Sequence, residues 1–548
     1  MPVDTGAVAR PSPTLRSDTA EAPERSAQDG PWSWNWPRRF AALAVMATGF
    51  VLAGGGNLDP GPVESRLGLA SFEGVGPFGQ VFGGWDPSIW PGQLAPAAAW
   101  AWGEGWIPTS ATVRWPAAIA GVWIGLILAR RLSTTLGGRA GVLLGLCWCG
   151  SVALIDRSSG AGIDLITGLG TVAALDRLLG RGTGYVAGLW AGLAFLAGGW
   201  PPLAIVVLAA VVMGRPGASL SWRLLLPPAA AAAAWTAWAW KVAPAEAWAA
   251  ALTLPLTEGP AWAFVPSVLA LGLPWSPFAA LGAGRSVRDG WPAPGRALVV
   301  GWLQIGGACL LAGTVVPGLA TAARVPALAG LAVAASACCD RLLGGSDSVA
   351  APVRRWFFGW PIVFTVLWTV TVAGLGGYLA AAVPYYRFVS VTLILLAPPA
   401  AALAFRAAAR REPRGALLAV AALAVFLKIG HLGYYVPEWN YRFSQGPWGR
   451  AIGQWVPPHW PIYTLHAWNH DLAFATHHPV HQLPSPQHLE YQPGEARYVL
   501  LLASEFANWP PQAAALTQVA TFQDEFGANR VLARTAGPLP WTPPTHER

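Results

Sequence analysis

The chain has 548 residues, of which 54% are hydrophobic and only 11% are charged. Soluble domains carry about 25% charged residues, so this composition excludes a soluble enzyme, a nucleic-acid-binding protein and a disulfide-rich secreted domain. Long apolar stretches instead indicate a protein that crosses a membrane many times. In such a protein, the excess of basic residues behind the formal net charge of +8 usually marks cytoplasmic loops and does not indicate that the protein binds a polyanion.

The first part of the chain sets the expected topology. Residues 1–38 are rich in Pro, Ser, Ala and charge, which predicts a disordered tail. Arginine pairs precede the apolar run 40–56 and follow the run 113–129, whereas residues 57–111 hold five acids and one base. Because cytoplasmic loops carry an excess of Lys and Arg, we expect a cytoplasmic tail and a long outer loop over 57–111.

The same alternation of basic ends continues along the chain. Two runs, 183–213 and 297–338, have basic groups at both ends and an internal break, so each predicts a pair of helices. The sequence therefore predicts an α-helical polytopic membrane protein with about 13 transmembrane helices, a cytoplasmic N-terminus and an outer C-terminus. The other apolar runs are 140–155, 164–176, 223–242, 261–281, 356–380, 389–405 and 415–432.

Residues 435–548 differ in composition from the preceding membrane domain, 39–434. All nine histidines lie at or after His431, and short strand-like runs replace the long apolar ones. These features predict a small extracytoplasmic α/β domain. Its expected elements are a helix over Pro447–Trp455 and strands over Trp460–Leu465, Arg497–Leu502 and Asn529–Ala533.

Cysteines and histidines give little indication of a cofactor. The five cysteines lie in or beside apolar runs, which predicts buried, unpaired thiols. His466, His470 and Asp471 have the spacing of metal ligands if they are helical, and solvated histidines are the alternative in this His-rich region. A divalent cation is the only cofactor that this spacing suggests.

The outer loop carries a candidate acid. A carboxylate at the membrane–water interface can act as a general base when it is partly desolvated and held by a nearby cation. Glu64, with Arg66 two positions later, offers both elements, and a solvated charged loop is the alternative. Asp86, in Gly-Gly-Trp-Asp-Pro-Ser, either lines an acceptor cleft or caps a turn.

A series of motifs then resembles a known family. They read Pro-Gly-Pro-Val-Glu-Ser-Arg-Leu at 60–67, Val-Arg-Trp-Pro-Ala-Ala-Ile-Ala-Gly at 113–121, Ile-Asp-Arg-Ser-Ser-Gly-Ala-Gly-Ile-Asp-Leu at 155–165 and Gly-Leu-Ala-Phe-Leu-Ala-Gly-Gly-Trp-Pro at 192–201. Their order and spacing are similar to those of the GT-C membrane glycosyltransferases of the aminoarabinose transferase and protein O-mannosyltransferase type. The resemblance extends from residue 38 to about residue 535.

The resemblance implies a reaction and its site. A sugar on a polyprenyl-phosphate donor would be transferred to a lipid, glycan or protein acceptor at the outer face of the bacterial inner membrane. The expected partners are therefore this donor, the acceptor and membrane lipids, and no nucleic acid is expected to bind. A carboxylate would serve as base for the acceptor hydroxyl, and a basic group would neutralise the lipid phosphate. The residues that match the family are Glu64 and Asp164 as catalytic acids and Arg66 for binding the lipid phosphate. Asp86, Arg114 and Arg387 are further substrate-binding candidates, the last from its position after Tyr385-Tyr386.

The sequence also departs from the family pattern. Val63 stands where the family has Asp, Gly198 stands where it has Lys, and the late Tyr pair is missing around 314–326, where Arg324 lies. An inactive homologue with a binding or scaffolding role is therefore the second hypothesis. A transporter is the third, although it would need charges within the spans, and the apolar runs are nearly free of them.

Overall fold

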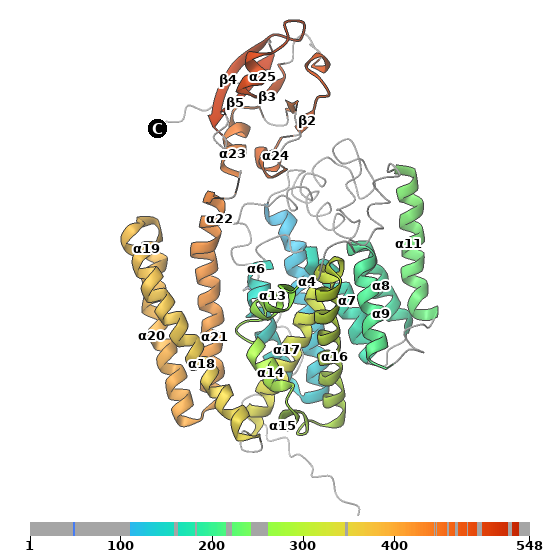
Figure 1. Cartoon of the computed structure of the whole chain (residues 1–548), viewed down its shortest axis with the longest axis vertical. Coiled ribbons are helices and arrows are strands. Elements are labelled where there is room, and N and C mark those ends of the chain that lie inside the picture. Colours follow the sequence, from blue (N-terminus) through green and yellow to red (C-terminus); the bar gives the residue numbers. More distant parts are fainter. Residues whose placement is uncertain are drawn as a thin grey trace, which may run out of the picture.

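A computed structural model of the chain describes residues 48–49, 110–157, 163–180, 184–214, 222–242, 261–345, 349–442, 444, 446–457, 460–465, 470–478, 480–489, 496–523 and 529–535. A helical membrane domain occupies one end, and a small sheet domain occupies the other (Figure 1). We call the end of the helices that faces the sheet domain the domain end. The expected tail and outer loop, with Glu64, Arg66 and Asp86, lie outside the described residues.

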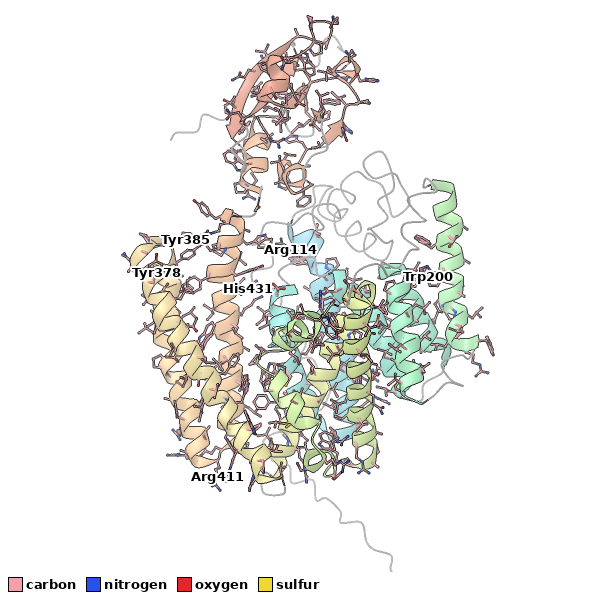
Figure 2. The ribbon with its side chains drawn as sticks, viewed as in Figure 1. Arg114, Trp200, Tyr378, Tyr385, Arg411 and His431 are labelled. Atoms are coloured by element: carbon pink, nitrogen blue, oxygen red, sulfur yellow. The ribbon has the colours of Figure 1, made fainter. Side chains whose placement is uncertain are left out.

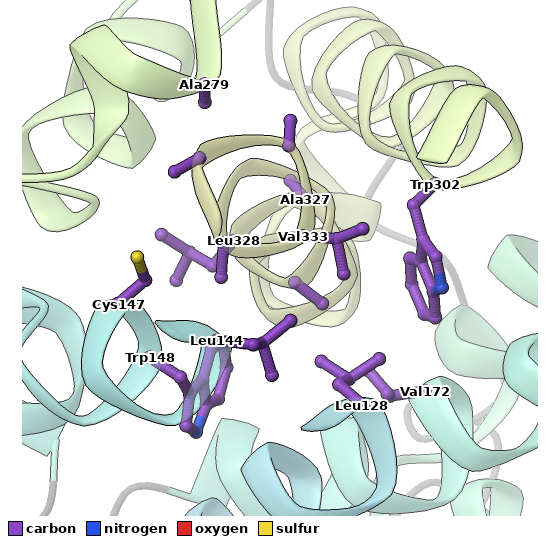
Figure 3. Close-up of a cluster of buried hydrophobic side chains, with 14 of the residues drawn as sticks. Leu128, Leu144, Cys147, Trp148, Val172, Ala279, Trp302, Ala327, Leu328 and Val333 are labelled. Atoms are coloured by element: carbon purple, nitrogen blue, oxygen red, sulfur yellow. The ribbon is translucent and has the colours of Figure 1, made fainter. Parts of the chain in front are cut away.

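The main bundle is built around one long, small-residue helix. Helix α17 is surrounded by side chains such as Leu128, Leu144, Val172 and Trp302 (Figure 3), and 89% of its most apolar window is buried. Its Ala, Gly, Ser and Cys residues let neighbouring helices approach closely. The bundle comprises α4 (Ser110–Leu136), α5 (Gly138–Cys149), α7 (Ile163–Leu179), α8 (Gly184–Gly198), α9 (Trp200–Val212), α11 (Trp222–Val242), α16 (Ala293–Val315) and α17 (Ala320–Gly345).

Both predicted helix pairs are confirmed. The run 183–213 divides at Gly199, whose φ of 73° lies in the left-handed region that glycine adopts readily. The run 297–338 divides between α16 and α17 at a 3₁₀ turn, Pro317–Leu319. The five cysteine thiols are free, and four of them are buried, as predicted.

Two other runs are interrupted where the sequence predicted continuous helices. The run 140–155 ends α5 at Cys149 and restarts as α6 (Val152–Arg157), whose Val152 N–H donates to the Leu273 carbonyl at 2.9 Å. The run 261–281 forms α13 (Phe264–Leu271) and α14 (Ser276–Gly282), which meet at 102°. Pro274 lies in that bend, and proline disrupts a continuous helix because it lacks an N–H. The short α15 (Arg285–Arg288) follows.

The remaining helices form a lateral bundle beside the main one (Figure 1). It has a small core of its own, made by Val372, Leu393, Ala400, Leu423 and Phe426. In its spans Ala351–Ala382 and Pro384–Arg410 only 17% and 28% of the most apolar window is buried, so these helices present apolar side chains outward. Its elements are α18 (Ala351–Thr371), η3 (Val372–Gly376), α19 (Gly377–Ala382), η4 (Pro384–Tyr386), α20 (Arg387–Arg410), α21 (Pro413–Gly430), η5 (His431–Tyr435) and α22 (Val436–Arg442).

The helical domain has the make-up of a multi-span membrane protein. Six described helices are long and apolar enough to cross a membrane, or seven if α13 and α14 together form one broken span. Three shorter apolar helices, α5, α8 and α9, accompany them. The predicted total of about 13 includes a run, 40–56, that lies almost entirely outside the described residues.

The C-terminal domain is a five-stranded mixed sheet with short helices, as the composition change predicted. The strand order is β2-β1-β3-β5-β4; β1 runs parallel to β2 and β3, and β5 runs antiparallel to β3 and β4. The predicted helix and three strands are present, whereas β2 and β4 were not predicted. The elements are α23 (Gly446–Gln454), β1 (Ile462–Thr464), α24 (His470–Thr476), β2 (Val480–Gln482), η6 (Pro486–His488), β3 (Tyr498–Leu502), α25 (Ala503–Ala507), β4 (Leu516–Gln523) and β5 (Asn529–Thr535).

The first described helix reaches into this domain. Val113, in the first turn of α4, is 1% exposed and belongs to the same apolar cluster as Ile452, Ile462 and Leu472 of the C-terminal domain. The helix that directly follows the predicted outer loop is thus packed against the sheet domain.

A buried histidine ties the domain together. The His478 ring nitrogens lie 3.0 Å from the Trp460 carbonyl (Nδ1) and 3.1 Å from the Gly453 carbonyl (Nε2). A ring nitrogen that carries a proton can donate to the carbonyl oxygen beside it. The side chain therefore links the end of α23 to the approach of β1.

We expect His478→Phe to destabilise the sheet domain by about 1–3 kcal/mol, since phenylalanine cannot hydrogen-bond to the buried carbonyls of Trp460 and Gly453. Hydrogen exchange of the β1 and α23 amides in the full chain measures this. His481→Phe, at an exposed position of β2, serves as the control, with an expected change within about 0.5 kcal/mol. Equal exchange in the two variants would contradict the prediction.

Candidate functional site

The described part of the candidate site centres on an ion pair at the domain end of the main bundle. Asp164 is the second residue of α7, where the helix dipole favours a negative charge. Its side chain is 4% exposed, and its Oδ2 lies 3.4 Å from the Arg324 guanidinium, whose side chain is 22% exposed. The pair is therefore largely removed from solvent, where its electrostatic interaction is stronger than at a surface.

A glycine explains why α7 and α17 approach closely enough to form this pair. A Cβ atom at Gly168, one turn after Asp164, would lie 2.4 Å from Cγ1 of Val325, the residue next to Arg324. The backbone of α7 thus rests on the Val325 side chain, which sets the separation of the two charged groups. The sequence separation of 160 residues hides this contact from local patterns.

A second polar cluster lies on α6 and η5. Asp156 Oδ1 is 3.8 Å from His431 Nε2, and the His431 ring stacks on Tyr435 with centroids 5.0 Å apart. Asp156 and Asp164 belong to the same short segment, the one that resembles the family's second acid motif. Within this segment, the Asp164 carboxylate therefore pairs with Arg324, and the Asp156 carboxylate faces His431.

Two further predicted residues, Arg114 and Arg387, lie on described helices, and Figure 2 labels Arg114 at the domain end of the main bundle. Arg114 is fully buried at the start of α4, one residue after Val113. Arg387 begins α20 in the lateral bundle, where it is exposed and its Nε donates to the Ala380 carbonyl at 3.4 Å. The assignments of Arg387 and Arg114 as substrate-binding residues stay predictions.

Gly198, which stands where the resembling family has Lys, lies in a tight contact between helices. A Cβ atom at Gly198 would lie 2.6 Å from Cγ2 and 2.8 Å from Oγ1 of Thr167 on α7. Position 198 is therefore closed by a helix–helix contact and has no room for a lysine side chain.

We expect Gly198→Lys to give no gain in ligand binding and Gly198→Ala to lower stability by about 1–3 kcal/mol, because both overpack the contact with Thr167. Gly307→Ala in α16 is the matched control, since nothing lies within 4 Å of its Cβ position. That variant should gain about 0.4–1 kcal/mol through a less flexible unfolded chain. Thermal unfolding in detergent compares them, and a Gly198→Ala variant as stable as Gly307→Ala would refute the packing explanation.

Sequence reasoning missed several members of these clusters. Arg324 was noted only as lying near a missing motif, and Asp156 only as part of the motif at 155–165. Lys428 was not singled out, although a lone lysine inside an apolar run is a signal of function. His431 was noted only as the first of the histidines.

No group of three or more His, Cys, Asp or Glu residues that could hold a metal ion is found among the residues that the structure describes. His470 does begin a helix, α24, but His466 lies outside the described residues. The suggestion of a divalent cation at this spacing therefore stays a prediction.

Comparison with known proteins bears on the fold. No protein-family model and no curated protein sequence matches the chain. The crystal structure of ArnT from Cupriavidus metallidurans bound to undecaprenyl phosphate is similar, with 18% identity and a TM-score of 0.67, and so is its apo state, with 16% identity and a TM-score of 0.65. Each match covers 92% of this chain and 99% of that chain. The chain thus has an ArnT-like fold, and the resemblance to this transferase is confirmed at the level of the fold.

Proposed function

We propose, from this fold, that the chain is a GT-C-type glycosyltransferase that takes a sugar from a polyprenyl-phosphate donor. The carrying observation is the match over nearly the full length of both chains to ArnT, a protein solved with undecaprenyl phosphate bound. The acceptor would be a lipid, glycan or protein at the outer face of a bacterial inner membrane. The basic residues at the ends of α4, α7 and α20 away from the sheet domain favour that orientation.

The proposed chemistry assigns roles to the ion pair. The acceptor oxygen forms a bond to the anomeric carbon, the bond from that carbon to the phosphate oxygen breaks, and polyprenyl phosphate leaves. A carboxylate accepts the hydroxyl proton. Asp164 is the described candidate, with Arg324 fixing its orientation, and Glu64, Arg66 and Asp86 are further candidates of the outer loop.

The test is transfer by the purified protein in lipid nanodiscs. Polyprenyl-phosphate donors with labelled pentoses or hexoses are supplied together with a membrane lipid extract as acceptor. Release of polyprenyl phosphate and labelling of the extract are the expected results. Failure to bind or consume any donor would refute the proposed function.

A catalytically inactive homologue is the second candidate, and the Thr167–Gly198 contact favours it. At the position of the family's lysine, this chain has helix packing instead of a phosphate partner. If the chain is an inactive homologue, polyprenyl phosphate should bind and the sugar donor should not be consumed. Measuring binding and donor turnover on the same preparation separates the two candidates.

A further inference from the structure

One described lysine lies inside an apolar span. Lys428 lies on α21, about 22 Å along the axis from Pro413 at about 1.5 Å per residue, and it is 5% exposed. In a hydrocarbon layer about 30 Å thick, this position is nearer the domain end than the opposite end. Ionisable residues within spans are unfavourable and are found mainly where they bind substrates or ions.

The next turn of the same helix carries a second basic group. His431 lies three positions after Lys428, and residues so spaced on a helix have Cβ atoms about 5–6 Å apart. Neither His431 ring nitrogen has a hydrogen-bond partner among the described residues, and both are buried. Buried polar atoms without a hydrogen bond destabilise a fold. A ligand with oxygen acceptors would supply the hydrogen bond that the His431 ring lacks.

The backbone at this point is also irregular. Residues His431–Tyr435 form a π-helical turn, η5, between two α-helical segments. Single π-turns inside helices occur frequently at functional sites. His431 begins the turn, and Tyr435, on which it stacks, ends it.

Asp156 completes the cluster from the main bundle. Its Oδ1 lies 3.8 Å from His431 Nε2, which is an ion-pair distance but too long for a hydrogen bond. The backbone bond from Val152 to Leu273 anchors α6, so Asp156 is held where it faces η5. Asp156 thus faces His431 from the main bundle, and Lys428 lies three positions before His431 on the lateral bundle.

The outward face of α21 near the junction is apolar. Leu418 and Val425, seven residues apart on α21, are 60% and 46% exposed, and they form an apolar stripe that leads toward Lys428. A polyprenyl tail would lie against such a stripe while its phosphate met the basic groups. Charge-assisted bonds of Lys and His to phosphate oxygens are among the stronger protein hydrogen bonds.

We propose that Lys428 and His431 bind the phosphate of the lipid-linked sugar donor at the junction of the main and lateral bundles, with Asp156 as a positioning residue for His431. This inference rests on the proposed function and supplies the phosphate partner that position 198 cannot hold. Because the His431 nitrogens are closed to solvent, donor entry opens the contact between η5 and α6.

Binding of undecaprenyl phosphate to the full chain in nanodiscs tests the proposal. Lys428→Met and His431→Gln should each weaken binding by about 10- to 100-fold, since each removes a hydrogen bond to a charged group. Lys428→Arg should keep affinity within a few-fold. Lys241→Met, which changes the other lysine of the chain, on α11, should bind as the wild type does.

Two further ligands identify what is recognised. Undecaprenol, which lacks the phosphate, should bind equally to wild type and Lys428→Met, whereas inorganic phosphate should compete only weakly with undecaprenyl phosphate. Lys428→Met should fold at least as well as wild type, because methionine avoids burying a charge. This keeps loss of folding apart from loss of binding.

The outcomes separate the two proposals. Wild-type affinity in both Lys428→Met and His431→Gln would overturn the site and leave the proposed function standing. Absence of wild-type binding to any polyprenyl phosphate would overturn both. Strong competition by inorganic phosphate would overturn the assignment to a lipid-linked ligand.

Discussion

We expect Asp164→Asn to lower the rate of sugar transfer by about 10²- to 10⁴-fold, the range that a positioned general base contributes. Asparagine keeps the size of the side chain and removes its capacity to accept a proton. The α7 helix and its contact with Val325 should therefore persist. Single-turnover transfer with a labelled polyprenyl-phosphate donor measures the effect.

Asp176→Asn is the matched control for this variant. Asp176 lies on the same helix, at the end away from the sheet domain, where Arg131 is 3.8 Å from it. In Asp176→Asn, the single-turnover rate of transfer per folded molecule should stay within a few-fold of the wild-type rate. Full activity in Asp164→Asn would remove this residue as the base and leave the predicted base in the outer loop, at Glu64.

The second large effect concerns stability. Arg324→Met removes the cation that faces the buried Asp164 carboxylate, and breaking a buried ion pair by losing one partner destabilises a protein by about 3–5 kcal/mol. The double variant Asp164→Leu/Arg324→Met replaces both charges by apolar groups and should recover most of that loss. Unfolding of each protein in mixed detergent micelles provides the comparison.

Activity in the double variant separates structural from chemical roles. A stable double variant without transfer would mean that the charges serve the reaction. A double variant as unstable as Arg324→Met would show that the pair does not act as a unit, contrary to the geometry.

The sequence was most informative where a physical rule acts locally. The break between α8 and α9 could be predicted because two glycines and two prolines gather within the five residues Gly-Gly-Trp-Pro-Pro, and a proline lacks the N–H that a helix interior uses. The break between α5 and α6, where Gly150 follows the last residue of α5, had no comparable signal, because single glycines occur in membrane helices without breaking them. The α13–α14 bend lay within a run that passed as one span by length alone.

The site was less predictable because its pairs are distant in sequence. Asp164 could be assigned from a motif, but its partner Arg324 could not, since only the packing of Gly168 on Val325 brings the two together. Lys428 and His431 could have been found from the sequence, because both are basic residues within one apolar run. Their link to Asp156 depended on the fold of α6 against α13 and α14.

The contact of Val113 with the sheet domain has a consequence for biogenesis. The start of α4 is made early on the ribosome, whereas the cluster that buries Val113 includes Ile452 and Leu472, which are made much later. Because chains fold from the N-terminus as they are synthesised, this end of α4 stays uncovered until the last fifth of the chain has left the ribosome. Folding of the domain end is therefore expected to finish after translation, and truncations that remove the sheet domain but spare every membrane span should leave the start of α4 unpacked.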